Sequence, residues 1–133
     1  MMRISRKSRG QALIEAVCTA MILIPIALCL LDIVVLVVAN AMNDSCAKTA
    51  ARSAANQADE VTALSAAKRA VSSLHTSAII KQVAMPGFFY DSGSGKVTVQ
   101  TQIEVHLPMP FPGISDLTFQ AKDVEAIVNF QPS

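Results

Sequence analysis

Two carboxylates in an otherwise uncharged apolar run are the residues of this sequence whose chemistry most needs an explanation. Glu15 stands at the start of the run and Asp32 lies inside it, 17 positions later, and no other charged residue occurs from Ala16 to Asn43. A charged carboxylate at the centre of a bilayer costs about 2.5–3.5 kcal/mol on insertion scales. Glu15 can avoid this cost at headgroup level, and Asp32, about 25 Å further along a helix, can approach the opposite interface. For Asp32 the alternative is a polar contact with a partner helix inside the membrane.

The other reactive side chains do not form a recognisable catalytic or metal-binding pattern. His75 and His106 are isolated, and neither has the spacing of a zinc site. Cys18 and Cys29 lie within the apolar run and act as small apolar residues. Cys46 follows the run, where it could join two chains by a disulfide or remain a packed free thiol. We therefore predict no enzyme activity, no metal and no cofactor.

The element that must position both carboxylates is a long apolar helix. Ala16 to Met42 comprises 27 residues, about 40 Å as a helix, against a bilayer hydrocarbon core of about 30 Å. Residues 1–10 carry four basic residues and no acid, leaving seven bases and ten acids in residues 11–133. Basic residues beside a membrane span mark its cytoplasmic side, and their confinement to one end excludes a basic nucleic-acid-binding face. These four residues are Arg3, Arg6, Lys7 and Arg9.

Two other interpretations of the apolar run remain open. The first is a secretory signal peptide, because Ala39-Asn40-Ala41 matches the small-x-small cleavage pattern. Its apolar region would be about twice the usual length of roughly 7–15 residues. The second is a buried core helix, for which the rest of the chain offers little material to surround it. A retained membrane helix is the interpretation that we favour.

The start of the chain resembles the N-terminus of a type IV prepilin. The matching residues are the basic leader ending at Gly10, the block Gln11-Ala12-Leu13-Ile14-Glu15, and the long apolar helix that follows. With Asp32 near the end of that helix, the pattern is similar to the TadE-like minor pseudopilins of tight-adherence (Flp-type) pili. The sequence departs from that family at Ala16, where an aromatic residue often stands, at Pro25, which lies about a turn late, and at Ile33-Val34, which replaces Phe-Gly.

The resemblance implies a processing site, a set of partners and a location. A prepilin peptidase would cleave between Gly10 and Gln11, making Glu15 the fifth mature residue, the position that pilins use in subunit docking. Implied partners are this peptidase, other minor and major pilins, pilus platform proteins and inner-membrane lipid, with no nucleic acid. The implied location is the bacterial inner membrane, single pass, with the N-terminus cytoplasmic, the head periplasmic, and incorporation into the extracellular pilus as a further step.

Physical chemistry suggests a role for Glu15 and for Pro25 without reference to the family. In a bundle of apolar helices, the new amine of Gln11 would be a buried cation, and a neighbour's Glu15 can neutralise it. Pro25 lacks an amide donor, and its ring crowds the carbonyl of Met21, which opens the helix ladder there. This opening predicts either a point at which the helix unwinds during assembly or an ordinary kink.

After the membrane segment the chain predicts two alanine-rich helices. The apolar positions step by three and four residues in two series: Ala47, Ala51, Ala54 and Ala58, then Leu64, Ala67, Val71, Leu74 and Ala78. The interval after Ala58 breaks the register, and Asn56 to Asp59 supply a stop and a possible N-cap. We predict that the first helix ends near Ala55 and that a second spans about 60–80. Because alanine buries little area, these helices need the sheet or a partner for stability.

The last third of the chain predicts an antiparallel sheet. Residues 97–107 alternate strictly between apolar and polar side chains, the pattern of a half-buried strand. Residues 88–90 are aromatic, and the turn sequence 91–95 links them to that strand as a hairpin.

The final strand is predicted to follow a proline-rich loop. Residues 108–113 contain three prolines and a glycine, a composition that disfavours ladder pairing. The apolar phase of residues 117–130 slips midway, which predicts a bulge near Lys122 and Asp123. The fold class is therefore α+β: a long transmembrane helix continuing beyond the membrane, a second helix, and a small three-stranded antiparallel sheet covered by that helix.

Three segments follow from these predictions: a basic prepilin leader at 1–10, a transmembrane helix at 11–42, and a periplasmic α+β head at 43–133. The function that we predict is a minor pseudopilin that helps initiate or cap a tight-adherence pilus. The alternatives are a single-pass envelope protein whose head binds periplasmic partners without peptidase processing, and a secreted domain released after Ala41.

Overall fold

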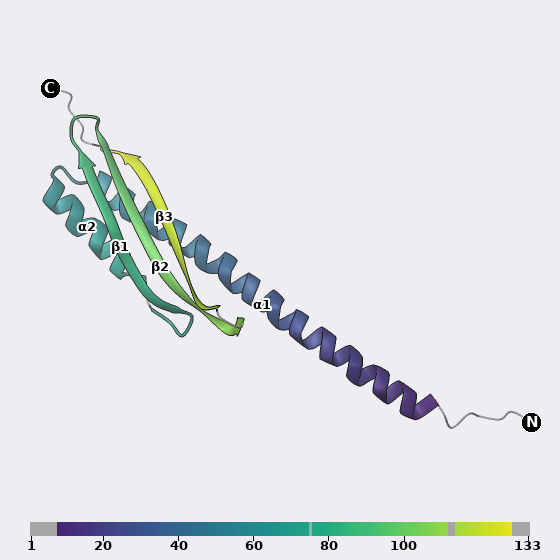
Figure 1. Cartoon of the computed structure of the whole chain (residues 1–133). Helices are drawn as coiled ribbons and strands as arrows, with labels where there is room; N and C mark the ends of the chain where they lie inside the picture. Colours follow the sequence, from purple (N-terminus) through teal and green to yellow (C-terminus); the bar gives the residue numbers. More distant parts are fainter. Residues whose placement is uncertain (1–7, 75, 112–113, 129–133) are drawn as a thin grey trace, which may run out of the picture.

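In the residues that the structure describes, the chain forms two helices followed by three strands, the α+β order that the sequence predicts (Figure 1). The computed structural model describes residues 8–74, 76–111 and 114–128, with the backbone alone at 8–9, 109–111 and 114. The elements are α1 (Ser8–Ala55), α2 (Glu60–Ser72), β1 (Ile80–Asp91), β2 (Lys96–Phe111) and β3 (Ile114–Ala126).

The N-terminal part of helix α1, residues 10–27, is exposed throughout and is called the bare half. The C-terminal part of α1 carries the head. Within the described residues, one helix, over Gly10–Ala55, is long and apolar enough to cross a membrane, with a mean hydropathy of 3.0 in its most apolar stretch. Only 6% of that stretch is buried in the structure, and Figure 1 shows it extending away from the sheet. The interpretation as a buried core helix is therefore wrong.

The break between the helices lies where the sequence predicts it. α1 ends at Ala55 and α2 begins at Glu60. Asp59 is the N-cap, because its Oδ2 accepts a hydrogen bond from the Thr62 amide at 3.0 Å and so satisfies one of the first-turn donors. The Thr62 hydroxyl also donates to Oδ1 of Asp59 at 2.7 Å, and this bond, followed by that of the amide, lowers the pKa of Asp59 below its ordinary value.

Helix α2 is shorter than predicted, because it ends at Ser72 rather than near Ile80. The hydroxyls of Ser72 and Ser73 donate to the carbonyls of Arg69 and Ala70 at 2.9 and 2.6 Å. Local bonds of this kind compete with continuation of the helix. Ile80 is instead the first residue of β1.

The sheet has the order β1-β2-β3, with both pairs antiparallel. On β2 the residues predicted to face inward are fully buried against the helices, among them Val97, Val99, Ile103 and Val105 at 0% exposure. α1 packs beneath β2 and β3, and α2 packs beside α1 and against β1. The two helices meet through buried alanines such as Ala51 and Ala67. These small side chains allow close approach, while the sheet supplies the larger apolar surface.

The pairing of β2 with β3 is regular, so the predicted bulge near Lys122 and Asp123 is wrong. The register runs without a shift from Lys96–Ala126 to His106–Asp116. A continuous ladder leaves Val124 48% exposed on the outer face, because side chains alternate strictly between the two faces of a strand. The regular pairing of β2 with β3 is therefore kept, and even-numbered apolar residues of β3 such as Val124 stay partly exposed.

The bulges lie in β1, which is also longer than the predicted strand at 88–90. The β1–β2 register shifts between Ile80 and Gln82 and again between Ala84 and Gly87. Pro86 falls inside the second shift, where a residue without an amide donor is tolerated.

The proline-rich segment is also more ordered than predicted. β2 continues to Phe111 and β3 starts at Ile114, so most of the predicted loop at 108–113 belongs to the strands. The ladder is interrupted between the pair His106–Asp116 and the pair Phe111–Ile114. Pro108 and Pro110 lie in this interruption, where the ladder requires no donor from them. β3 ends at Ala126, short of the predicted limit at 130, which lies outside the described residues.

Candidate functional site

The predicted processing site lies on the bare half of α1. Gly10 is exposed, and a Cβ added to it would meet nothing within 4 Å. Glycine inside a helix is less favourable than alanine by about 1 kcal/mol, and no contact in the described part of the chain requires it here. Gln11, the predicted first mature residue, is exposed as well. A requirement for Gly10 would therefore come from another molecule.

Glu15 lies on the same bare surface. Its side chain is exposed and, within the described residues, makes no hydrogen bond or ion pair. Its carboxylate is thus available to a partner, such as an amine on a neighbouring chain. Arg3, Arg6 and Lys7 lie outside the described residues, as does the side chain of Arg9.

Pro25 lies inside α1, which remains helical on both sides of it. Neighbouring residues in a membrane helix can compensate for the missing hydrogen bond. Unwinding at Pro25 during assembly therefore stays a prediction.

Asp32 marks the point at which the head begins to cover α1. It is 2% exposed, whereas Leu31 and Ile33 beside it are 59% and 50% exposed. Further along this side of the helix, Ala39 packs with Ile103. The sequence predicts either an interfacial Asp32 or one in contact with a partner helix. In the structure its side chain is buried within its own chain, and its depth in a membrane stays a prediction.

A buried polar contact that the sequence analysis did not identify joins α1 to the sheet. The Thr101 hydroxyl donates to Oδ1 of Asn43 at 2.8 Å, and Nδ2 of Asn43 donates to the Phe119 carbonyl at 3.1 Å. Asn43 and Thr101 are both 0% exposed. The sequence contains one sign of this contact, because Thr101 is a hydroxyl residue among the otherwise apolar, inward-facing positions of β2. This contact connects α1 to both β2 and β3.

Cys46 is packed rather than available for a disulfide between chains. It is 6% exposed and belongs to the cluster around Ala50 and Ala54. Burial raises the pKa of its thiol, which lowers the fraction of the reactive thiolate. The structure therefore favours the free packed thiol.

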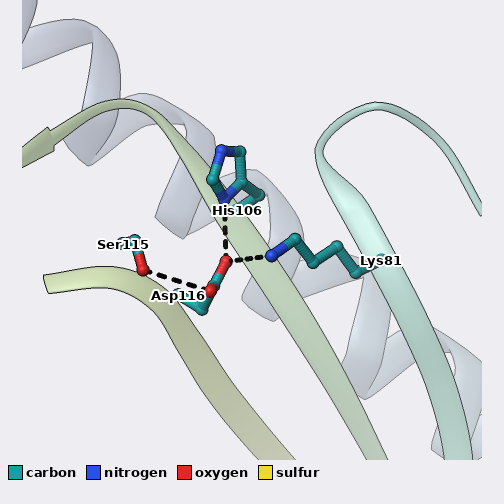
Figure 2. Close-up of polar contacts among 4 residues, drawn as sticks. All are labelled: Lys81, His106, Ser115 and Asp116. Atoms are coloured by element: carbon teal, nitrogen blue, oxygen red, sulfur yellow. Dashed lines mark hydrogen bonds and ion pairs between the residues drawn. The ribbon is translucent and has the colours of Figure 1, made fainter.

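A cluster of charged residues joins all three strands at the end of the sheet nearest the bare half of α1 (Figures 1 and 2). Oδ1 of Asp116 on β3 lies 2.7 Å from Nζ of Lys81 on β1 and 2.7 Å from Nδ1 of His106 on β2. Ser115 Oγ donates to Oδ2 of Asp116 at 3.1 Å. The Lys81 hydrogen bond, followed by that of His106, lowers the pKa of Asp116 to about 2.

This geometry fits a structural role, in which Asp116 holds the ends of the three strands together. In nucleophilic catalysis a hydroxyl must donate to the imidazole, but Ser115 donates to Asp116 instead. His106 looked isolated in the sequence, because Asp116 lies ten residues away and Lys81 on another strand. Within the described part of the chain no group of three histidine, cysteine, aspartate or glutamate side chains could hold a metal ion.

Comparison with known proteins adds no relative. No protein-family model, no curated protein sequence and no solved structure matches the chain. Any functional assignment therefore depends on the residues and their geometry.

Proposed function

We propose that this protein is a minor pseudopilin of a tight-adherence type IV pilus, processed by a prepilin peptidase and helping to initiate or cap pilus assembly. The observation that carries the proposal is the bare half of α1. There a basic leader ends at Gly10, Glu15 is exposed, and an uncharged apolar surface continues into the helix that carries the head.

The division of α1 into a bare half and a covered half supports a role in assembly. A head fixed to the second half cannot cover the first, so the exposed apolar side chains need lipid or the helices of other subunits around them. Both environments are available to a subunit that leaves a membrane for a filament. The other minor and major pilins, and the platform proteins that handle them, are the partners of this proposal.

The continuity of α1 argues against release of a secreted domain. A cut after Ala41 would fall inside α1 and remove Ala39, which is 2% exposed and packs against Ile103 and Val105. The segment before the cut is therefore part of the folded head, in addition to any role in targeting.

Processing is tested by co-expression with an active prepilin peptidase, followed by intact mass and N-terminal sequencing. We expect the mature chain to begin at Gln11. The variant Gly10→Leu should remain an unshifted precursor, whereas Ala12→Leu, a matched change at an exposed position two residues away, should be cleaved. A native chain that keeps its leader contradicts the proposal and favours the unprocessed envelope protein. A chain that begins at Met42 favours the secreted domain.

Docking is tested separately through Glu15. The variant Glu15→Ala should be cleaved normally but should be depleted from sheared pili or from complexes with other minor pilins, because the buried amine of Gln11 loses its counter-charge. Glu60→Ala, which removes an exposed carboxylate from α2, is the matched control and should assemble normally. Normal incorporation of the Glu15 variant would remove Glu15 from the site.

A further inference from the structure

Beyond Asp32, helix α1 has two different sides. On the side facing the sheet, Asp32, Ala39 and Asn43 are 2%, 2% and 0% exposed. On the opposite side, Val34 and Val38 are 58% and 52% exposed although the helix is already within the head. The exposed apolar surface of α1 therefore continues past the start of the head, but on one side only.

The apolar strip consists of Val34, Val37, Val38 and Met42, and three of these residues, Val34, Val38 and Met42, line one side of a groove. The groove has a volume of about 250 Å³, and Ile79, from the segment between α2 and β1, stands on its other wall. Ile79 is itself 38% exposed. The strip and the groove together make a surface without a charged side chain among the residues that line it.

The uncharged surface is longer than the hydrocarbon core of a bilayer is thick. The charged residues flanking it are Glu15 and Asp44, and Asp32 between them is buried. Ala16 to Met42 measures about 40 Å along the helix axis, about 10 Å more than the hydrocarbon core. A tilt of about 40° brings the whole length into the core, at the upper end of the range observed for membrane helices.

The asymmetry of the head gives this tilt a direction. The sheet, with its polar outer face, occupies one side of α1, and the apolar strip occupies the other. Leaning toward the strip places it in the bilayer and lifts the sheet away from it. Past Met42 the same surface becomes polar at Ser45 and Thr49, which line the next groove along α1, so the polar boundary of the membrane falls there.

We propose that the apolar strip and the Ile79 groove lie in the leaflet on the head's side of the membrane, with lipid acyl chains as their occupant. The strip is continuous with the bare membrane segment, and no polar or charged residue separates the two, which favours lipid over a separate protein partner. The proposal depends on α1 crossing a membrane and is independent of leader processing and pilus assembly.

The test exploits the absence of tryptophan from the chain. The variant Val38→Trp of the full-length protein is reconstituted in phosphatidylcholine vesicles whose acyl chains are brominated either near the headgroup or near the chain end. Ile24→Trp, at an exposed position in the bare half, and Val61→Trp, at a 77% exposed position on α2, are the references for membrane and water. Val37→Trp, at a 64% exposed position, is a second probe of the strip.

We expect both strip variants to have blue-shifted emission, quenched more strongly by bromine near the headgroup than by bromine near the chain end. Ile24→Trp should show lipid quenching with deeper bromine, and Val61→Trp should show water-like emission without lipid quenching. Water-like, unquenched emission from both strip variants would overturn the proposal. Blue-shifted emission that brominated lipid leaves unchanged would also overturn it, because protein would then cover the strip. Either result leaves the processing test unaffected.

Discussion

Replacing Asn43 by alanine tests whether the buried polar contact holds α1 beneath the sheet. The substitution removes the acceptor of the Thr101 hydroxyl and the donor to the Phe119 carbonyl, at 2.8 and 3.1 Å. A buried polar group left without a partner costs about 1–3 kcal/mol. In the variant, Thr101 keeps a longer contact, 3.4 Å, to the backbone carbonyl of residue 43. This contact reduces the cost of leaving the Thr101 hydroxyl without its side-chain acceptor. We therefore expect a loss of about 2–4 kcal/mol in the free energy of unfolding of the head.

The assay is urea unfolding of the full-length protein in a mild detergent, followed by far-ultraviolet circular dichroism and fitted to a midpoint and slope. Asn40→Ala, on an exposed position of the same helix, is the matched control and should change the unfolding free energy by less than about 0.5 kcal/mol. Thr101→Val alone should cost about 1–2 kcal/mol, because it leaves Oδ1 of Asn43 without its donor.

The double variant of Asn43 and Thr101 provides the decisive comparison. A valine at position 101 has no hydroxyl to satisfy, so the double variant should lose about 1–2 kcal/mol less than the sum of the single variants. The reasoning is refuted if Asn43→Ala is as mild as Asn40→Ala, or if the two single effects simply add.

Three further predictions concern the head. The pKa of Asp116 is about 2, against an ordinary value of 3.8. The contribution of Asp116 to stability should therefore be complete above about pH 4 and be lost as the pH falls toward 2. A carboxyl NMR titration measures this pKa, which Lys81→Met should raise. Arg52→Gln breaks a surface ion pair with Glu125, in which the Arg52 side chain is 71% exposed, so it should cost less than about 1 kcal/mol in urea unfolding. Gly95→Ala forces a residue with a Cβ into φ 66° and should cost about 1–2 kcal/mol in the same assay.

Elements set by local chemistry were predicted well. The break after Ala55, the N-cap at Asp59 and the alternation along β2 all follow from side chains acting on their own backbone or on one face of one element. The C-terminal end of α2 was predicted wrongly, because the apolar series continues to Ala78 whereas the helix ends at Ser72. Periodicity reports which face can be buried, and it does not report where competing local bonds stop a helix.

The bulge positions depend on pairing between strands. The phase slip around Lys122 was a genuine feature of β3, but the ladder with β2 stays in register and the irregularity lies near Pro86 of β1. Pairing is decided by the partner strand and by the helices beneath it, neither of which a single segment encodes.

The residues alone establish the apolar helix, its basic start, the positions of Gly10 and Glu15 beside that start, and the order of helices and strands. All of these depend on composition and short-range spacing. Long-range packing buries Asp32 within its own chain, brings Asn43 to Thr101, and lets Lys81 and His106 share Asp116. Each of these contacts joins residues from different elements or hides a charge beneath another layer, and such contacts exist only once the strands have paired and the sheet has packed on α1.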